Sequence, residues 1–231
     1  MFDLILKTIL TNHVSTVEIA DALGKTGVIS GISALNSGHF AAAKAFYICT
    51  WGNSNWPLHE QTQYVPPGHM VYIDVINCEN RAVIGDIVAR WLLVHQESAG
   101  VIVNGLVRDI HQLRKGDYPI WCTGYTPLGC SNNRVGCSSG TKLYIKSQSK
   151  RFDRAILVAD DSGCTLIGSE FQTQELLDRI NFIKLQEDIW YFCTDTLKMS
   201  TYETICLKRY LKETNLLPQT LQASLQAFGT L

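Results

Sequence analysis

The sequence predicts an α/β fold built around a mixed sheet. The first observation is a strand, helix, strand pattern between residues 70 and 103, which is the usual unit of a parallel or mixed sheet. The second is a pair of short apolar runs, residues 155–159 and 164–167, joined by an Asp-rich turn that ends in glycine and is typical of a hairpin. The third is composition, because 231 residues with 46% hydrophobic and 18% charged side chains can bury a substantial core.

The N-terminal part is predicted to be helical. Residues 2–10 form one candidate helix, and a second begins near Ser15, which can cap it, and runs to Leu23. A glycine shortly afterwards ends this helix. Residues 41–50 fit either a strand or a small-residue segment approached closely by another backbone, because their periodicity does not distinguish the two.

The central part is predicted to alternate between strands and a helix. Residues 70–75 follow a Pro-Pro-Gly turn and are typical of a strand. Apolar residues from Ile84 to Leu92 recur at helical spacing, and the apolar run 101–103 suits a strand buried on both faces. Residues 119–122 predict a further strand.

The C-terminal part is predicted to be helical. Ser169 and Gln172 match a capping box in front of a helix, and the last 40 residues lack strand signals. No linker or internal repeat divides the chain. We therefore expect a single domain over residues 1–231, with a helical extension over residues 191–231 that could pack against a partner subunit.

Charge and hydropathy exclude several classes of function. The chain has 20 Lys and Arg against 21 Asp and Glu, so it has no net field that would attract nucleic acid or an anionic membrane. No apolar run reaches the roughly 18 residues of a membrane span, and the N-terminus lacks the basic region of a signal peptide. We therefore expect a cytoplasmic protein that binds neither nucleic acid nor a membrane. The eight cysteines form no C-x-x-C pair, which predicts reduced and mostly buried thiols.

The stretch from Gly85 to Asp109 is the most informative for chemistry. A helix opens at Gly85-Asp86, and the free N–H groups of a helix start suit a carboxylate or phosphate. Arg108 and Asp109 follow a buried strand, where ligands collect in α/β folds. Arginine can bind a carboxylate bidentately, and aspartate can bind a hard divalent cation. Taken alone, the first feature is better explained as an ordinary helix start, and the Arg-Asp pair is weak evidence, because adjacent opposite charges commonly form surface or core ion pairs.

Several segments, taken in order, resemble a known family over roughly residues 10–190. The family unites the regulator of ribonuclease E activity A with the class II 4-hydroxy-4-methyl-2-oxoglutarate and 4-carboxy-4-hydroxy-2-oxoadipate aldolases. The matching segments are Ser15–Leu23 with Gly27, Asn55–Glu60 with Pro67-Gly68 and Asp74, Gly85-Asp86, Ala99–Asp109, Asp117–Gly129 and Val158–Gly163.

This resemblance implies a fold, an assembly and an activity. The fold would be a three-layer β/β/α domain of the swivelling kind, assembled as homotrimers or hexamers with sites between subunits. The activity would be that of a lyase that cleaves a small 2-oxo acid to pyruvate with Mg²⁺ or Mn²⁺. The same apparatus would decarboxylate oxaloacetate, because both reactions pass through the enolate of pyruvate. An ordered water, free or on the metal, would take the proton of the 4-hydroxyl group.

The resemblance also assigns roles to particular residues. Arg108 and Asp109 are the predicted catalytic pair: Arg108 would hold the pyruvoyl carboxylate, and Asp109 would bind the metal directly. Glu187 is the candidate for an acidic group that reaches the metal through water from a neighbouring subunit. The residues that would bind the substrate carboxylate together with Arg108 are Gly85, Asp86, Ile87 and Val88.

Three features depart from the family pattern. The acidic residue expected after Arg-Asp is Gln112, and the residue four before Arg108, commonly Asp in the aldolases, is Asn104. The segment between Asp86 and Arg108 has 21 intervening residues, one more than the family spacing. The amide side chains of Gln112 and Asn104 cannot supply a negative charge. The retained Asp109 favours metal chemistry, because the ribonuclease-regulator branch tends to lose it.

Three functions stay open on the sequence. The first is the metal-dependent lyase, and the second is a non-catalytic oligomeric regulator that binds a ribonuclease or another protein. The third is an enzyme with a changed substrate, in which residues 51–56 and the loop 130–140 reshape a pocket. We interpret His59 as making a structural hydrogen bond and His111 as a surface residue, and neither as a metal ligand.

Overall fold

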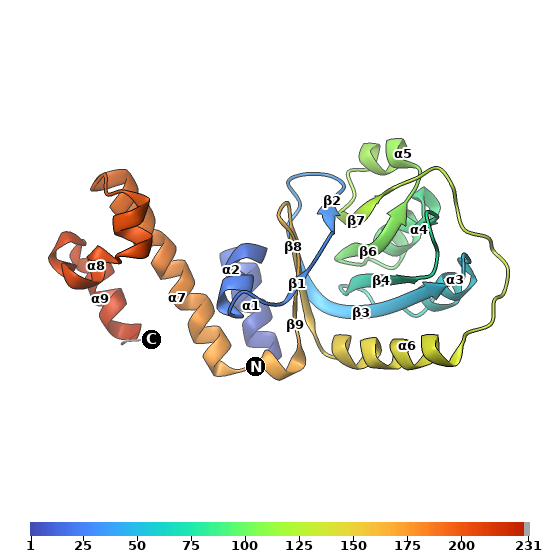
Figure 1. Ribbon diagram of the computed structural model, residues 1–231, viewed down its shortest axis with the longest axis horizontal. Helices are drawn as coiled ribbons and strands as arrows, with labels where there is room; N and C mark the ends of the chain where they lie inside the picture. The colour runs from blue at the N-terminus through green and yellow to red at the C-terminus, as the bar shows by residue number, and fades with distance from the viewer. Residues whose placement is uncertain (229–231) are drawn as a thin grey trace. The chain divides into compact units, whose positions relative to one another are not determined.

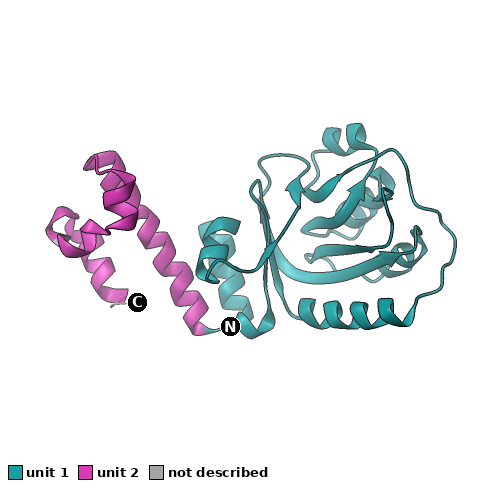
Figure 2. Cartoon of the chain, viewed as in Figure 1, with its two compact units in different colours: residues 1–173 teal, residues 174–231 magenta. Residues whose placement is uncertain are grey.

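The computed structural model describes residues 1–228, which divide into two compact units (Figure 1 and Figure 2). The first unit covers residues 1–173 and contains all the strands of the described chain. The second begins at Gln174 and is helical as far as it is described. The boundary between the two units therefore falls ahead of the extension that we expected from residue 191.

A mixed nine-stranded sheet organises the first unit, in the order β1-β9-β8-β3-β4-β6-β7-β2 with β5 paired to β6. The long strand β3 (Ala41–Trp51) joins the two halves of the sheet, because it pairs antiparallel with β8 (Ile156–Asp160) and parallel with β4 (Met70–Ile76). Residues 41–50, which the sequence left open, thus form a strand. The remaining strands are β1 (Val28–Ile29), β2 (Ser33–Ala34), β5 (Ala82–Ile84), β6 (Gly100–Val107), β7 (Ile120–Tyr125) and β9 (Gly163–Ile167).

Helices surround this sheet and connect its strands (Figure 1). The helices of the first unit are α1 (Phe2–Asn12), α2 (Thr16–Ala22), α3 (Trp56–Thr62), α4 (Asp86–Arg90), α5 (Ile110–Lys115) and α6 (Ser139–Phe152), with a π-helical turn η1 (Trp91–His95) and a 3₁₀ turn η2 (Ser169–Phe171). The two predicted N-terminal helices are confirmed.

Two apolar cores define three layers. One core joins the β8–β9 hairpin to the central strands through buried residues such as Leu157 and Ile102, and the indole N–H of Trp121 in this core donates to the carbonyl of Asp160 at 2.8 Å. The other core lies between the central strands and helices α3, α4 and α5. The structure therefore confirms the mixed α/β class with its β/β/α layers.

The start of α2 shows how local sequence fixes an element. The Ser15 hydroxyl accepts the N–H of Glu18 at 3.2 Å, and the Glu18 carboxylate accepts the N–H of Ser15 at 2.7 Å. This reciprocal pair is the capping box of the helix. The N–H and hydroxyl of Thr16 both donate to Asp160, at 2.8 and 2.7 Å, which ties α2 to the β8–β9 hairpin.

Three predicted elements differ from the structure. Ile84 ends strand β5 instead of belonging to a helix, which begins only after Gly85. Strand β6 continues past the predicted end to Val107. The capping box at Ser169 is wrong, because the Gln172 side chain donates to the carbonyls of residues 154 and 167 and α7 (Gln174–Tyr191) begins later.

The second unit is built from helical segments around its own core. They are α7, η3 (Phe192–Thr196), η4 (Tyr202–Cys206), α8 (Arg209–Lys212), η5 (Thr214–Leu216) and α9 (Gln219–Phe228). Buried Ile189, Cys193 and Tyr210 lie in this core, and the indole N–H of Trp190 donates to the hydroxyl of Tyr210 at 3.2 Å. This confirms the helical prediction for the last 40 residues as far as they are described. Across both units, no described helix is long and apolar enough to cross a membrane.

The eight cysteines are free thiols, and five of them are buried. Burial raises the pKa of Cys49 to about 11, and it also raises the pKa values of Cys122 and Cys164. Because the thiolate is the reactive form, these thiols should stay unreactive at pH 7.5. We expect maleimide to label the exposed Cys206 within minutes and the three buried thiols only after unfolding, as measured by peptide mass spectrometry. Labelling of Cys164 at the rate of Cys206 in the native protein would contradict this.

Candidate active site

Arg108 and Asp109 lie where β6 ends and the chain turns into α5. Asp109 is the N-cap of α5 and has φ 59° and ψ 36°, a left-handed conformation that is uncommon for residues with a Cβ and is often found at functional sites. The two side chains are 48% and 45% exposed, and Arg108 Nε lies 3.8 Å from Asp109 Oδ2. A constrained backbone therefore presents both charged groups to solvent.

The loop before α4 closes around the Asp109 carboxylate. The N–H of Asp86 donates to Asp109 Oδ2 at 3.2 Å. A Cβ at Gly85 would collide with the same oxygen and would lie 3.1 Å from Cγ of Arg108. We expected Gly85 to admit a ligand, and in the structure it admits the Asp109 side chain. Within residues 1–228 the N–H groups of Ile87 and Val88 have no hydrogen-bond partner, so they stay the candidates for a bound carboxylate.

A second glycine accommodates Arg108. A Cβ at Gly129 would lie 2.5 Å from Nη1 of Arg108, and the carbonyl of Gly129 accepts a hydrogen bond from Nη1 of Arg81 at 3.0 Å. Burial raises the pKa of the neighbouring Cys130 thiol to about 12, and the guanidinium groups of Arg81 and Arg108 oppose this rise. Two cations therefore lie close together at the site. Sequence reasoning missed Arg81, because nothing local links it to Arg108.

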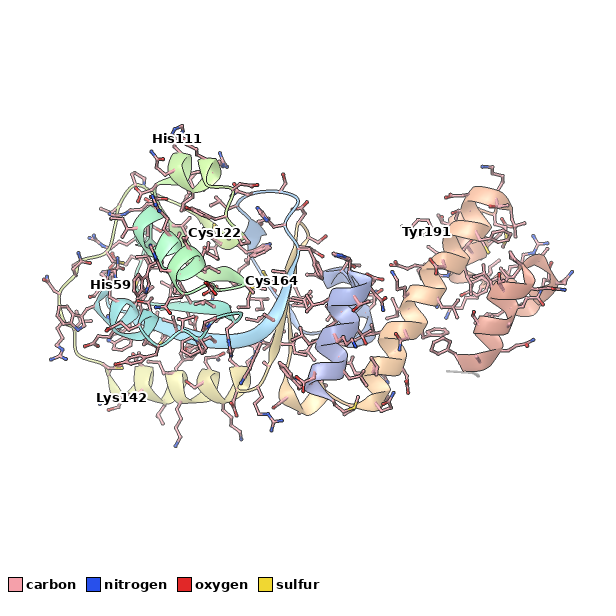
Figure 3. The ribbon with its side chains drawn as sticks, turned by 180° about the vertical axis from the view of Figure 1, so that it is seen from behind. His59, His111, Cys122, Lys142, Cys164 and Tyr191 are labelled. Atoms are coloured by element: carbon pink, nitrogen blue, oxygen red, sulfur yellow. The ribbon has the colours of Figure 1, made fainter. Side chains whose placement is uncertain are left out.

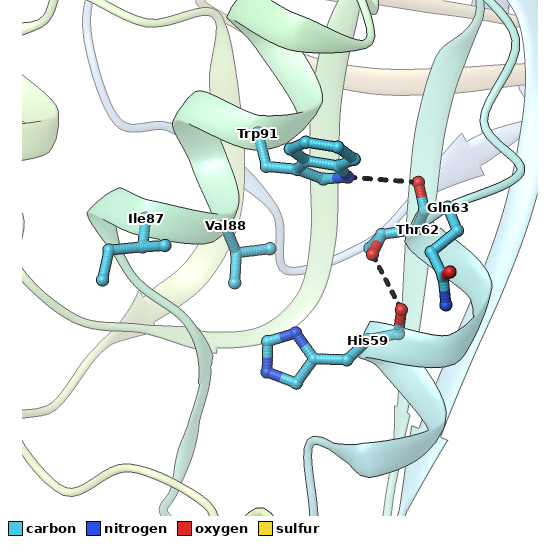
Figure 4. A pocket seen from close by; sticks show the side chains of 6 residues that line it. All are labelled: His59, Thr62, Gln63, Ile87, Val88 and Trp91. Atoms are coloured by element: carbon cyan, nitrogen blue, oxygen red, sulfur yellow. Dashed lines mark hydrogen bonds between the residues drawn. The ribbon is translucent and has the colours of Figure 1, made fainter.

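A pocket of about 270 Å³ opens beside the start of α4 (Figure 4). The imidazole of His59, which belongs to α3, faces Val88 across it. We expected a structural hydrogen bond for this ring, but it makes none to any residue of the described chain, and only the His59 carbonyl accepts the Thr62 hydroxyl at 3.1 Å. The pocket is lined by His59, Thr62, Gln63, Ile87, Val88 and Trp91. His111 is exposed on α5, as expected (Figure 3).

Comparison with known proteins assigns the chain to a family. The RraA-like family model, described as Aldolase/RraA, matches residues 16–166, which is more than half of the chain. The chain belongs to the RraA-like family. This confirms the resemblance seen in the sequence.

Individual relatives of this RraA-like protein are distant. It is 26% identical over 182 residues to protein DlpA of Legionella pneumophila, a match that covers 75% of the chain and 29% of DlpA. It is 29% identical over 127 residues to a Halalkalibacterium halodurans protein named as a candidate 4-hydroxy-4-methyl-2-oxoglutarate aldolase, a match that covers 53% of the chain and 59% of that protein. The matches therefore span less than two thirds of either curated relative.

A solved structure supports the fold of the RraA-like chain. Streptomyces coelicolor RraAS2, described as an unusual member of the RNase ES inhibitor RraA protein family, superposes with a TM-score of 0.59 at 20% identity. The match covers 80% of this chain and 94% of RraAS2. At this identity the likeness concerns the fold alone.

The segment between Asp86 and Arg108 contains a π-helical turn. Helix α4 continues directly into the π-helical turn η1, in which the N–H of Gln96 donates to the carbonyl of Trp91 at 2.9 Å. Each hydrogen bond of a π turn encloses one residue more than an α turn, and such turns recur at functional sites.

Asn104, which departs from the family pattern, contacts the buried carboxylate of Asp74 on β4. Nδ2 of Asn104 donates to Oδ1 of Asp74 at 3.2 Å, and the Tyr47 hydroxyl donates to Oδ2 at 3.1 Å. Asp74 is 2% exposed, and burial together with its charge raises the pKa of Tyr47. A carboxylate at position 104 would repel this neighbour, whereas the amide donates to it. The Asn104 amide thus stabilises the buried Asp74 carboxylate.

Two of the remaining predicted residues lie on helices. Gln112 is exposed on α5, where its N–H donates to the Asp109 carbonyl at 2.9 Å. Glu187 belongs to α7 in the second unit and lines a pocket of about 200 Å³ together with Trp190 and Tyr191. Its expected action on a metal bound to a neighbouring subunit stays a prediction.

The two segments that we expected to reshape a pocket contact each other. The indole N–H of Trp51 donates to the carbonyl of Gly136 at 3.1 Å, and the hydroxyl of Ser54 donates to the carbonyl of Asn133. Arg134 stacks 5.7 Å above the Trp56 ring. Residues 51–56 and the loop 130–140 therefore form one connected surface.

The donor set at Asp109 fits one kind of metal site. Within the described residues, no group of three or more His, Cys, Asp or Glu side chains is placed to hold an ion. No hydrogen bond from residues 1–228 reaches Oδ1 of Asp109, which is therefore available. Mg²⁺ commonly keeps several waters and takes one or two carboxylates together with the substrate. A single exposed carboxylate suits such a cation and does not suit a closed structural site such as tetrahedral zinc.

Proposed function

We propose that the chain is a divalent-metal-dependent carbon–carbon lyase that cleaves a small 2-oxo acid to pyruvate, similar to 4-hydroxy-4-methyl-2-oxoglutarate aldolase. The observation that carries this proposal is the seating of Arg108 and Asp109, each against a glycine that leaves room for its side chain. Membership of a family described as Aldolase/RraA supports it. Decarboxylation of oxaloacetate would use the same groups.

Arg108 would bind the substrate carboxylate. Its guanidinium can donate two parallel hydrogen bonds to the two carboxylate oxygens, and the free N–H groups of Ile87 and Val88 add donors from the helix start. Arg81 adds positive potential beside Gly129, because its Nη1 is held there by the glycine carbonyl. These groups orient the 2-oxo acid with its 2-oxo oxygen toward Asp109.

Asp109 is the residue that would hold Mg²⁺ or Mn²⁺ through Oδ1. Such an ion, when bound, supplies Lewis-acid stabilisation of the charge that develops on the 2-oxo oxygen. In the cleavage, the 4-hydroxyl group loses its proton, the bond between C3 and C4 breaks, and its electron pair passes to C3. The enolate formed takes up a proton at C3 to give pyruvate, while C4 becomes the carbonyl of the second product.

We also propose that the chain acts in the cytoplasm as a homo-oligomer, a trimer or a hexamer. In such an assembly Glu187 of one subunit would face the metal held by Asp109 of the next. The support for this is membership of the RraA-like family. Sedimentation of the full chain, with Glu187→Gln assayed for activity, would test both statements.

The lyase proposal predicts metal-dependent pyruvate release that needs Arg108. We expect pyruvate from 4-hydroxy-4-methyl-2-oxoglutarate and from oxaloacetate with Mg²⁺ or Mn²⁺, measured with a coupled lactate dehydrogenase assay. Arg108→Ala should lower kcat/KM about 100-fold, because it removes a charge-assisted bidentate contact worth about 3 kcal/mol. Arg108→Lys should recover only part of it, because lysine lacks the planar fork. Pyruvate no faster than the free metal produces would contradict the lyase proposal.

A further inference from the structure

The pocket between α3 and α4 is lined in part by the residues that directly follow Asp86, which contacts the Asp109 carboxylate. Asp86 gives its N–H to the Asp109 carboxylate, and the next two residues, Ile87 and Val88, form one wall of the pocket. A molecule whose carboxylate lies on Arg108 and whose 2-oxo oxygen faces Asp109 therefore has this pocket beside its remaining carbon atoms. In a 2-oxo acid those atoms are C4 and its substituents.

The lining of the pocket is apolar and carries no fixed charge. Ile87, at the start of α4, is 84% exposed, and Trp91, directly after the end of α4, is 41% exposed, so two large apolar side chains face solvent here. The lining contains no Lys, Arg, Asp or Glu. A second carboxylate placed here would lose water without gaining a cation, whereas an apolar group would cover exposed hydrocarbon.

His59 is the titratable residue of this lining, and its ring is free to meet a ligand. The Thr62 hydroxyl and the Trp91 indole already donate within the pocket wall, at 3.1 Å to the His59 carbonyl and 3.4 Å to the Thr62 carbonyl. The His59 ring has no partner in the described chain and points across the pocket (Figure 4). It is placed to hydrogen-bond a hydroxyl group on C4.

We propose that this pocket is the subsite for the C4 end of the substrate and that it selects 2-oxo acids with an apolar group at C4, with His59 facing the 4-hydroxyl. The proposal rests on the proposed function, in which Arg108 and Asp109 hold the 2-oxo acid end. It predicts that this chain prefers a 2-oxo acid with an apolar C4 end over the dicarboxylate 4-hydroxy-4-methyl-2-oxoglutarate, which it should cleave less efficiently.

The test compares three 2-oxo acids that lack the 4-hydroxyl and so cannot be cleaved. They carry a phenyl, a methyl or a carboxylate group on C4: 2-oxo-4-phenylbutanoate, 2-oxopentanoate and 2-oxoglutarate. We expect calorimetry on the full chain with Mg²⁺ to show the phenyl compound binding at least tenfold more tightly than 2-oxoglutarate. Gln63→Arg places a cation at the pocket and should increase the affinity for 2-oxoglutarate about tenfold. Ser147→Arg adds the same charge on α6, which does not line the pocket, and should change neither affinity.

The outcomes separate the subsite from the lyase. If the binding order holds and 4-hydroxy-2-oxo-4-phenylbutanoate yields pyruvate and benzaldehyde, both proposals stand, and His59→Gln should slow this reaction. If the order holds and no aldol yields pyruvate, the subsite stands and the lyase is wrong. If 2-oxoglutarate binds as tightly as the phenyl compound in wild type and Gln63→Arg alike, the subsite is overturned. If none of the three binds, both proposals fall.

Discussion

Asp109→Asn should lower metal-dependent kcat/KM about 1,000-fold, a loss of about 4 kcal/mol in transition-state stabilisation. Hard divalent cations prefer carboxylate oxygens, and the amide that replaces them carries no charge. The fold should survive, because asparagine tolerates the left-handed backbone at φ 59° and its amide oxygen can still accept the N–H of Asp86. Calorimetric titration with Mn²⁺ should show the matching loss of binding, which is a readout independent of turnover.

Asp117→Asn is the matched control for this variant. Asp117 is also a left-handed aspartate, at φ 48°, and is exposed, with its carboxylate 3.1 Å from His39. This change removes one negative charge at a position that does not contact Arg108. It should leave both the Mn²⁺ affinity and the turnover within about twofold of the wild-type values. If Asp109→Asn kept wild-type metal dependence, Asp109 could not be the metal ligand. If wild type itself bound no Mn²⁺ and captured a ribonuclease equally well with Asp109→Ala, the regulator function would replace the lyase.

The strands could be predicted where a short stretch of sequence decides them. Strand β4 and the β8–β9 hairpin are apolar runs bounded by Gly, Pro or an Asp-rich turn and lie where the pattern places them, and the apolar run 101–103 marks the first part of β6. Helix α6 was missed, because its side chains are mostly polar and Phe152 is its one buried residue. The local signal was Ser138, whose hydroxyl accepts the N–H of Thr141 at 3.1 Å and caps the helix.

The candidate site could be predicted only in part, because short stretches of sequence decide only some of its features. Arg108 and Asp109 stand out because their types and spacing suit the chemistry. The contacts of this pair with Gly85 and Gly129 do not, since Gly85 lies 23 residues before Arg108 and Gly129 lies 21 residues after it. What brings these glycines to the pair is strand pairing, of β5 with β6 and of Ala82 with Gly129. Register between distant strands leaves no trace in local periodicity.

Gly85→Ala should lower kcat/KM about 100-fold while the melting temperature changes little. The backbone of Gly85, at φ −140°, is one that alanine adopts freely, so the substitution brings no conformational penalty. The added Cβ collides with the Asp109 carboxylate, and this is the far end of a side chain that can rotate away. Displacement of a catalytic group by about 1 Å costs on the order of 100-fold. Steady-state kinetics and thermal unfolding on the same samples measure both quantities.

The double variant Gly85→Ala with Asp109→Asn decides whether the glycine acts through that carboxylate. If it does, the two losses should not add, and the double variant should be about as slow as Asp109→Asn alone. Gly136→Ala provides the control, because a Cβ there would meet no atom within 4 Å. Additive losses would mean that Gly85 serves the substrate itself, by close approach of its backbone, as the sequence alone first predicts. Wild-type activity in Gly85→Ala would show that the position of Asp109 does not limit the reaction.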